Sequence, residues 1–166
     1  MTKLEELIQK FCPDGVPFRT IGECVKSPSN IKWSFSNDTE YQYIDLTSVD
    51  RDTHNIGETK TICAGNAPSR AQQIVYAQDI LLGTTRPLLR RFCTVPNEYN
   101  GQICSTGFCV LRADDTIVLH RWLYHQISTN KFFDYVEKNQ KGASYPAISD
   151  SDVKKFSIPI PPLPVQ

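Results

Sequence analysis

A short apolar run that leads into a basic segment limits the fold more than any other part of this chain. The residues Ile80, Leu81 and Leu82 are bounded by Asp79 and Gly83, and a run of this length suits a buried strand better than a helix. A group of three arginines follows closely: Arg86, Arg90 and Arg91. The sequence therefore predicts a rigid strand that ends in a guanidinium-rich segment. Guanidinium groups pair well with phosphates and with guanine edges.

The positive charge of the chain is concentrated in its middle. Lysine and arginine number 18, against 18 aspartate and glutamate, so the net charge gives no reason to expect nucleic acid as a partner. Residues 61–112, however, carry five arginines and only two acidic residues. At 166 residues the chain has the size of one domain with a substantial core. Its basic middle is therefore the candidate binding region.

The first 40 residues predict a short helix followed by turns and loops. Thr2 and Glu5 have the spacing of a capping box. The apolar residues around them share one helical face: Leu4, Leu7, Ile8 and Phe11. A turn is expected at 12–15 and a polar loop at 26–40.

Strands dominate the prediction for residues 41–111. Aromatic and β-branched residues favour strands at 41–46, 92–95 and 102–111, in addition to the run at 80–82. The segment 47–67 is rich in turn residues, with 54–57 as the expected turn. This region is expected to be mostly sheet.

The last third predicts helices and an extended tail. Asp114 or Asp115 is expected to cap a helix that contains 118–127, and a second helix is expected around 132–136. Ser149 caps one more short turn, and 156–164 reads as an extended strand or polyproline segment. The predicted fold class is α+β: a single globular domain with a central, mostly antiparallel twisted sheet, a short N-terminal helix and a helical pair after residue 114.

The cysteines and histidines do not form a recognisable metal or nucleophile motif. The six cysteines include no C-x-x-C pair, and His120 and His125 are five residues apart, which does not align them on one helical face. The glycine-rich loop and the Asn/Asp-Pro-Pro-aromatic element of a DNA methyltransferase are both absent from the sequence. We expect reduced, mostly buried thiols in a cytosolic protein, no cofactor and no self-contained active site. That absence favours a recognition function.

Two other classes of function remain open at this point. A magnesium-dependent nuclease would use clustered carboxylates with a lysine, for which the candidates are Glu58 and Lys60 with Asp45, Asp50 or Asp52 upstream. A protein-interaction module would use the Pro-rich tail at 158–164, on the expectation that this tail is exposed. No apolar run is long enough to span a bilayer, so a membrane partner is not expected.

Four groups of residues, in order along nearly the whole chain, carry a resemblance to a known family. They are Cys12-Pro13-Asp14-Gly15-Val16-Pro17-Phe18 with Ile21-Gly22-Glu23, then Ser69-Arg70-Ala71 with Asp79-Ile80-Leu81-Leu82-Gly83-Thr84-Thr85-Arg86-Pro87, then Cys104-Ser105-Thr106-Gly107-Phe108, and finally Lys141-Gly142-Ala143-Ser144-Tyr145-Pro146-Ala147-Ile148 with Ile158-Pro159-Ile160-Pro161-Pro162-Leu163. In this order they resemble the target recognition domain of type I restriction-modification specificity subunits.

The resemblance implies a subunit that recognises one half of a split double-stranded DNA target and has no catalytic residues of its own. Methyl transfer and cleavage would belong to separate modification and restriction subunits, in the cytoplasm of a prokaryote. In the family a spacer helix follows each such domain. Since this chain stops at Gln166, we expect residues 1–166 to be a single recognition domain cut from a longer protein before that helix.

Nine residues are the candidate DNA contacts: Arg70, Thr85, Arg86, Arg90, Arg91, Lys141, Gly142, Ser144 and Tyr145. Arg86 is the predicted base contact, because Pro87 fixes it at the end of a buried strand. Arg90 and Arg91 are expected to meet phosphates. In the second segment, Gly142 would permit close backbone approach and its neighbours would offer hydroxyl groups, although Tyr145 could instead pack on the sheet.

Overall fold

Strand β6 (Ile80–Gly83) lies at the centre of the fold, as predicted for the run 80–82, and all four of its residues are buried. The computed structural model describes residues 1–35 and 38–166, so two residues of the predicted loop 26–40 lie outside the described residues. β6 pairs antiparallel with β7 (Phe92–Thr94) and with β9 (Phe108–Ala113). With β2 (Val25–Lys26) these strands form a four-stranded sheet in the order β2-β9-β6-β7.

A second four-stranded sheet has the order β4-β3-β8-β5. Its strands are β3 (Tyr41–Ile44), β4 (Lys60–Ile62), β5 (Ala71–Ile74) and β8 (Ile103–Ser105). Its pairs are antiparallel except for β3 with β8, which run parallel. A third pair, β1 (Phe18–Thr20) with β10 (Ser157–Pro159), joins the two ends of the chain. The α+β class with mostly antiparallel strands is confirmed, and the strands divide among these sheets rather than forming one central sheet.

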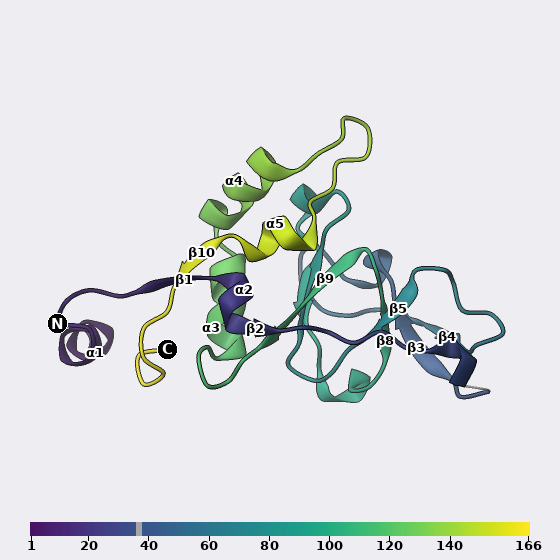
Figure 1. Cartoon of the computed structure of the whole chain (residues 1–166), viewed down its shortest axis with the longest axis horizontal. Helices are drawn as coiled ribbons and strands as arrows, with labels where there is room; N and C mark the ends of the chain where they lie inside the picture. The colour runs from purple at the N-terminus through teal and green to yellow at the C-terminus, as the bar shows by residue number, and fades with distance from the viewer. Residues whose placement is uncertain (36–37) are drawn as a thin grey trace.

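The helices are α1 (Lys3–Phe11), α2 (Ile21–Cys24), α3 (His120–Ile127), α4 (Asn130–Asn139) and α5 (Asp150–Lys154). Single 3-10 turns occur at η1 (Trp33–Phe35), η2 (Leu46–Ser48), η3 (Pro87–Leu89) and η4 (Asn97–Tyr99). In Figure 1, α2 to α5 gather beside the β6 sheet, and the second sheet lies at the opposite end of the molecule from α1.

Alternate side chains of β6 serve two different cores. Ile80 and Leu82 pack with the helices in one cluster, which includes Phe132 and Phe133 of α4. Leu81 faces the other way, into a cluster with Phe108 that lies between the two four-stranded sheets. Successive side chains of a strand point to opposite faces, so a strand buried on both faces must be apolar throughout.

The predicted strand at 102–111 is wrong in one respect, because the chain breaks it into β8 and β9. The break is a tight turn at Thr106 and Gly107, in which the Gly107 amide donates to Ser105 Oγ at 3.0 Å. A Cβ on Gly107 would lie 2.9 Å from Leu46 Cδ1, so a larger residue would require the Leu46 side chain to move. The two halves consequently belong to different sheets.

Three other predictions in the sheet region need correction. The strand expected at 41–46 ends at Ile44, because Asp45 caps η2. The turn expected at 54–57 lies earlier, where the His54 amide donates to Asp50 O at 3.0 Å. Strands β4 and β5 were not expected; they are only three and four residues long, and they form through pairing with β3 and β8.

The helix predictions hold with one shift. The Thr2 and Glu5 capping box of α1 is present, and Ser149 caps α5 as predicted. The helix expected after Asp114 begins only at His120, because the Asp114 carboxylate instead accepts from the Thr116 amide and stabilises a turn. Thr129 caps α4, which spans the predicted second helix.

The first part of the C-terminal tail is packed, so the expectation that the tail is exposed holds only for residues 162–164. β10 pairs with β1, and Ile158 and Ile160 are buried. The side-chain Nε2 of Gln166 donates to Ile117 O and to Pro161 O, at 3.0 and 2.8 Å. The segment 158–161 therefore packs against the core, whereas residues 162–164 are exposed.

The cysteines are free, and all but Cys63 are buried, as predicted. Burial raises the pKa of the Cys93 thiol to about 12. No helix among the described residues is both long and apolar enough to cross a membrane.

Candidate nucleic-acid interface

The residues that follow β6 pair with a distant segment near the C-terminus. The Arg86 amide donates to Pro146 O at 2.7 Å, and the Ile148 amide donates to Thr84 O at 3.0 Å. Between these bonds, Thr85 and Ala147 form an isolated antiparallel bridge. Two of the predicted DNA-contact segments, 85–86 and 141–145, therefore lie side by side.

The second of these segments is a closed loop. Lys141 and Ala147 exchange two backbone hydrogen bonds, of 2.8 and 2.9 Å. Inside the loop Gly142 has φ +101°, and a Cβ there would lie 2.8 Å from Tyr145 O. Gly142 is thus required by the turn of its own loop, a local reason that differs from the close approach to a ligand predicted for it.

Exposed polar and aromatic side chains gather where the two segments meet. The Arg86 guanidinium lies over the Tyr145 ring, with 5.1 Å between Cζ and the ring centroid. Tyr145 is 73% exposed, so it stands on the surface and does not pack on the sheet. Lys141 and Ser144 are exposed in the same loop. Within residues 1–35 and 38–166, neither Arg86 nor Lys141 has a carboxylate within salt-bridge distance.

Arg86 is held in an unusual backbone conformation. Its φ is +48° and its ψ is 58°, a left-handed geometry that is costly for a residue with a side chain. Pro87 at the next position is buried, and the backbone amide of Arg86 is fixed by Pro146 O. The surroundings therefore set the direction in which the guanidinium leaves the backbone.

Arg90 and Arg91 are half-buried and have partners inside the molecule. Arg90 Nη1 donates to Asn130 Oδ1 at 3.1 Å, and its guanidinium lies 4.5 Å from the centroid of the Phe133 ring. Arg91 Nη1 lies 3.5 Å from Leu46 O and 3.3 Å from Val49 O. Both side chains thus hold η3 against neighbouring elements, a role that the prediction of phosphate contacts does not include.

The turn between β8 and β9 connects Arg70 to the same surface. The Thr106 amide donates to Arg70 O at 2.9 Å. On the other side of the turn, the Thr84 amide and hydroxyl both donate to Gly107 O, at 2.8 and 3.0 Å. Arg70 is exposed, as is Thr106. A chain of backbone contacts therefore links Arg70, through this turn, to Thr85 and Arg86.

Buried polar side chains fix the turn from below, and the sequence prediction missed them. Gln73 Nε2 donates to Ser105 O at 2.9 Å and to Phe108 O at 2.8 Å. Ser105 is fully buried, and Gln73 and Thr84 are each 7% exposed. A Ser-Thr-Gly sequence at 105–107 inside a predicted strand was the available signal of a turn that needs such support.

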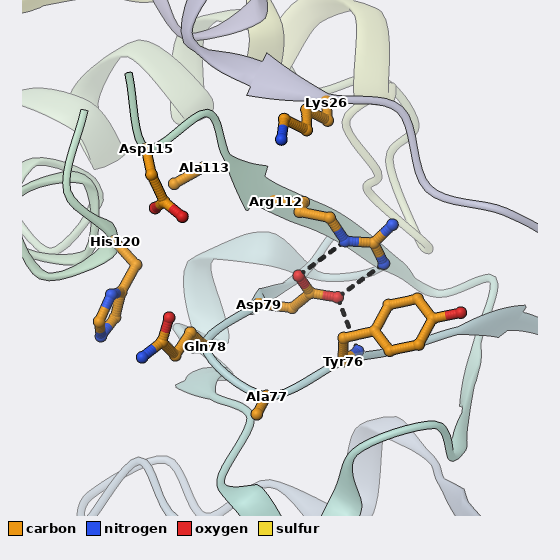
Figure 2. Close-up of a pocket in the computed structure, with 9 residues that line it drawn as sticks. All are labelled: Lys26, Tyr76, Ala77, Gln78, Asp79, Arg112, Ala113, Asp115 and His120. Carbon is orange, nitrogen blue, oxygen red and sulfur yellow. Dashed lines mark hydrogen bonds and ion pairs between the residues drawn. The ribbon is translucent and has the colours of Figure 1, made fainter. Parts of the chain in front are cut away.

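A polar pocket lies at the opposite end of β6 from Arg86. It has a volume of about 220 Å³, and Figure 2 shows the Arg112 guanidinium joined to the Asp79 carboxylate beside the Tyr76 ring. Arg112 Nε and Nη2 donate to Asp79 at 3.0 and 2.8 Å, and the guanidinium lies 4.6 Å from the centroid of that ring. The hydrogen bonds with Asp79 raise the pKa of Arg112. Since Asp79 is only 2% exposed, this ion pair anchors the start of β6.

The residues considered for a nuclease come together only in part. The Asp50 carboxylate accepts from the backbone amides of Asp52 and Thr53, each at 2.8 Å, and so stabilises a turn. Asp45, Glu58 and Lys60 line one pocket of about 310 Å³, which Asp50 and Asp52 do not line. Across the described parts of the chain, no group of three or more His, Cys, Asp or Glu side chains has the arrangement of a metal site.

Comparisons with known proteins agree with the resemblance. The model of the family described as "Type I restriction modification DNA specificity domain" matches residues 13–166. The Type I restriction enzyme HindI specificity subunit of Haemophilus influenzae is 27% identical over 96 residues, which are 57% of this chain and 21% of that protein.

Two solved chains are similar over most of this one. The HsdS subunit from Thermoanaerobacter tengcongensis is 33% identical, with a TM-score of 0.82 over 92% of this chain and 39% of its own length. A chain from a study of complex assembly and conformational transition of the type I R-M system is 34% identical, with a TM-score of 0.84 over 91% of this chain and 39% of its own length. This chain therefore spans about two fifths of those solved chains, and it belongs to the type I restriction modification DNA specificity domain family.

Proposed function

We propose that this chain is a single target recognition domain, residues 1–166, that reads one half of a split target in double-stranded DNA. The observation that carries the proposal is the pairing of residues 84–86 with 146–148, which joins two candidate segments into one exposed surface. Family membership supplies the class of ligand. The pairing fixes the backbone of the side chains that would contact the DNA.

Arg86 is the proposed base contact. Stacking on Tyr145 and the fixed backbone limit the freedom of the guanidinium, so less entropy is lost when it binds a guanine edge. A bidentate arginine–guanine pair contributes about 1–3 kcal/mol of discrimination. Thr85 and Ser144, which flank Arg86 and Tyr145, would donate hydroxyl hydrogen bonds to bases or phosphates.

Arg70 and Lys141 are the proposed phosphate contacts, because both are exposed cations and lie on either side of Arg86 along the connected surface. Arg90 and Arg91 remain candidate phosphate contacts, but only through the guanidinium N–H groups that do not bond to their internal partners. Gly142 shapes the loop that carries Lys141 and Tyr145. Contacts with phosphates would fix the position of the domain, and contacts with bases would select the sequence.

The rest of the complex is proposed from the family. We infer that the domain is not itself catalytic and that modification and restriction subunits, bound to the complete specificity subunit, carry out methyl transfer and cleavage in the cytoplasm of a prokaryote. The relative whose description names complex assembly of the type I R-M system supports this inference. Family membership does not favour the interaction-module and nuclease alternatives, and the described residues contain no group of three or more His, Cys, Asp or Glu that could hold a metal ion.

Selection from a randomised duplex library tests the proposal. The 166-residue chain is expected to retain duplexes that share one short motif, and the Arg86→Ala variant is expected to lose the preference at one guanine within it. Circular dichroism of both proteins controls for folding. Retained duplexes without any shared motif, or no retained duplex at all, would contradict sequence recognition by this domain.

A further inference from the structure

A shallow apolar groove lies between η3 and the loop 141–147. It has a volume of about 340 Å³ and is lined by Arg86, Leu88, Leu89, Gln140 and Pro146. Leu88, Leu89 and Pro146 give it a hydrocarbon wall, and the cation of Arg86 borders it. The groove is therefore continuous with the proposed DNA-contact surface, and this inference rests on that proposed function.

The leucine on this wall is exposed and held rigidly. Leu88 is 41% exposed, although it lies within a single turn whose first residue, Pro87, is buried. The turn is closed by hydrogen bonds of 3.0 Å from the Leu89 amide to Arg86 O and from the Arg90 amide to Pro87 O. Leu88 lies in one groove with Leu89 and Pro146 beside Arg86, so the groove can accommodate a ligand that carries an apolar group next to a site for a hydrogen-bond acceptor.

Gln140, which also lines the groove, has a buried side-chain oxygen without a donor in the described part of the chain. Its backbone N–H ends α4 by donating to Val136 O at 2.8 Å. Its side-chain Oε1 is buried and has no hydrogen-bond partner among the described residues. Burial of an acceptor without a donor is unfavourable, so the side chain would gain by turning toward a ligand that offers an N–H group.

We infer that this groove reads one A·T base pair from the major groove of the target. In that groove thymine presents its 5-methyl group, and adenine presents N7 and the N6 amino group. The hydrocarbon wall with Leu88 matches the methyl group, and the Gln140 amide can donate to N7 and accept from N6. G·C pairs have no methyl group, and guanine would place its O6 acceptor against Oε1 where adenine has its amino donor.

Base analogues test the inference without any change to the protein. In the motif that the 166-residue chain selects, each thymine is replaced in turn by uracil and each adenine by 7-deazaadenine, and binding is measured by fluorescence anisotropy. One A·T pair is expected to respond to both changes. Loss of the methyl group should weaken binding about fourfold there, from about 0.8 kcal/mol per buried carbon group.

Two variants assign the effects to the groove. Leu88→Ala should abolish the response to uracil, and Gln140→Leu should abolish the response to 7-deazaadenine at the same pair. Leu119→Ala is the matched control, because Leu119 has a similar exposure, 39%, and precedes α3 away from the groove. This control should retain both responses.

The outcomes separate this inference from the proposed function. A selected motif in which no A·T pair responds to both analogues would overturn the inference and leave sequence recognition intact, as would responses that persist in both variants. Failure to select any motif would overturn the proposed function and the inference together. Equal loss of binding to every duplex in Leu88→Ala, without a change in the analogue responses, would indicate a non-specific contact and also overturn it.

Discussion

Replacement of Gly142 by alanine is expected to impair DNA discrimination through a steric effect that the structure makes explicit. At φ +101°, a Cβ on this residue would lie 2.8 Å from Tyr145 O, whereas ordinary contacts begin at 3.4 Å. The loop must therefore open by several tenths of an ångström. Because Tyr145 carries the ring beneath Arg86, opening of the loop removes the support of the proposed base contact.

Gly15 provides a matched control for this substitution. Its φ is also +101°, but a Cβ there would have nothing within 4 Å. Both alanine variants should lose about 1–2 kcal/mol from the left-handed backbone alone. Only Gly142→Ala should also lose discrimination, by about 1–3 kcal/mol if the bidentate guanine contact of Arg86 is disrupted.

The assay compares the two variants by urea denaturation and by anisotropy titration of a selected duplex and a scrambled duplex. The expected result is a larger loss of unfolding free energy for Gly142→Ala than for Gly15→Ala, because only the former has a backbone clash, and a loss of discrimination for Gly142→Ala alone. Equal discrimination in the two variants would refute the reasoning, because it would mean that the loop geometry at Gly142 does not control the binding surface.

Three further results are expected. Arg86→Ala should relax sequence preference, whereas Lys141→Ala should weaken binding to all duplexes alike and reduce the slope of log affinity against log salt concentration by about 0.9. Titrations at several salt concentrations measure both effects, and the same change in the two variants would contradict separate roles for Arg86 and Lys141. Asp79→Ala leaves Arg112 without its carboxylate and should lower the free energy of unfolding, measured by urea denaturation, by about 3–5 kcal/mol. Replacement of both residues by leucine should cost less, and an equal loss in the single and double variants would argue against a coupled pair. Burial raises the pKa of Cys93 from 9.0 to about 12, so the thiol ionises at lower pH in the unfolded chain and the free energy of unfolding should fall as the pH rises from about 9 to 12. Cys93→Ala should reduce this pH dependence of stability, and an unchanged profile in the variant would contradict the role of Cys93.

Local features of the fold could be predicted from local sequence. The run at 80–82 is apolar on both faces and could only be a buried strand, and the side chains of Thr2 and Ser149 cap their helices three residues away. The division into separate sheets could not be predicted in this way. It depends on the parallel pairing of β3 with β8, which joins Tyr43 to Ile103, and on the turn at Gly107, whose Ser-Thr-Gly sequence does not show that the two halves of the strand join different sheets.

The candidate site divides in the same way. The sequence identified Arg86 and the loop at 141–145 as separate segments, but the bridge between Thr85 and Ala147 that joins them is a tertiary contact with no local signal. The same limit applies to Arg90, which the charge cluster grouped with Arg86. Its contacts with Asn130 and Phe133 depend on how α4 packs against η3.

The most direct test of the account is a domain graft. Residues 1–166 replace one recognition domain of a complete specificity subunit, the modification subunit is co-expressed, and methylated adenines are mapped across the genome. The account predicts a new half-site on the grafted side only, with relaxed sequence at one position when the graft carries Arg86→Ala. A complex that remains active but methylates no new half-site would contradict the claim that this chain recognises a DNA sequence.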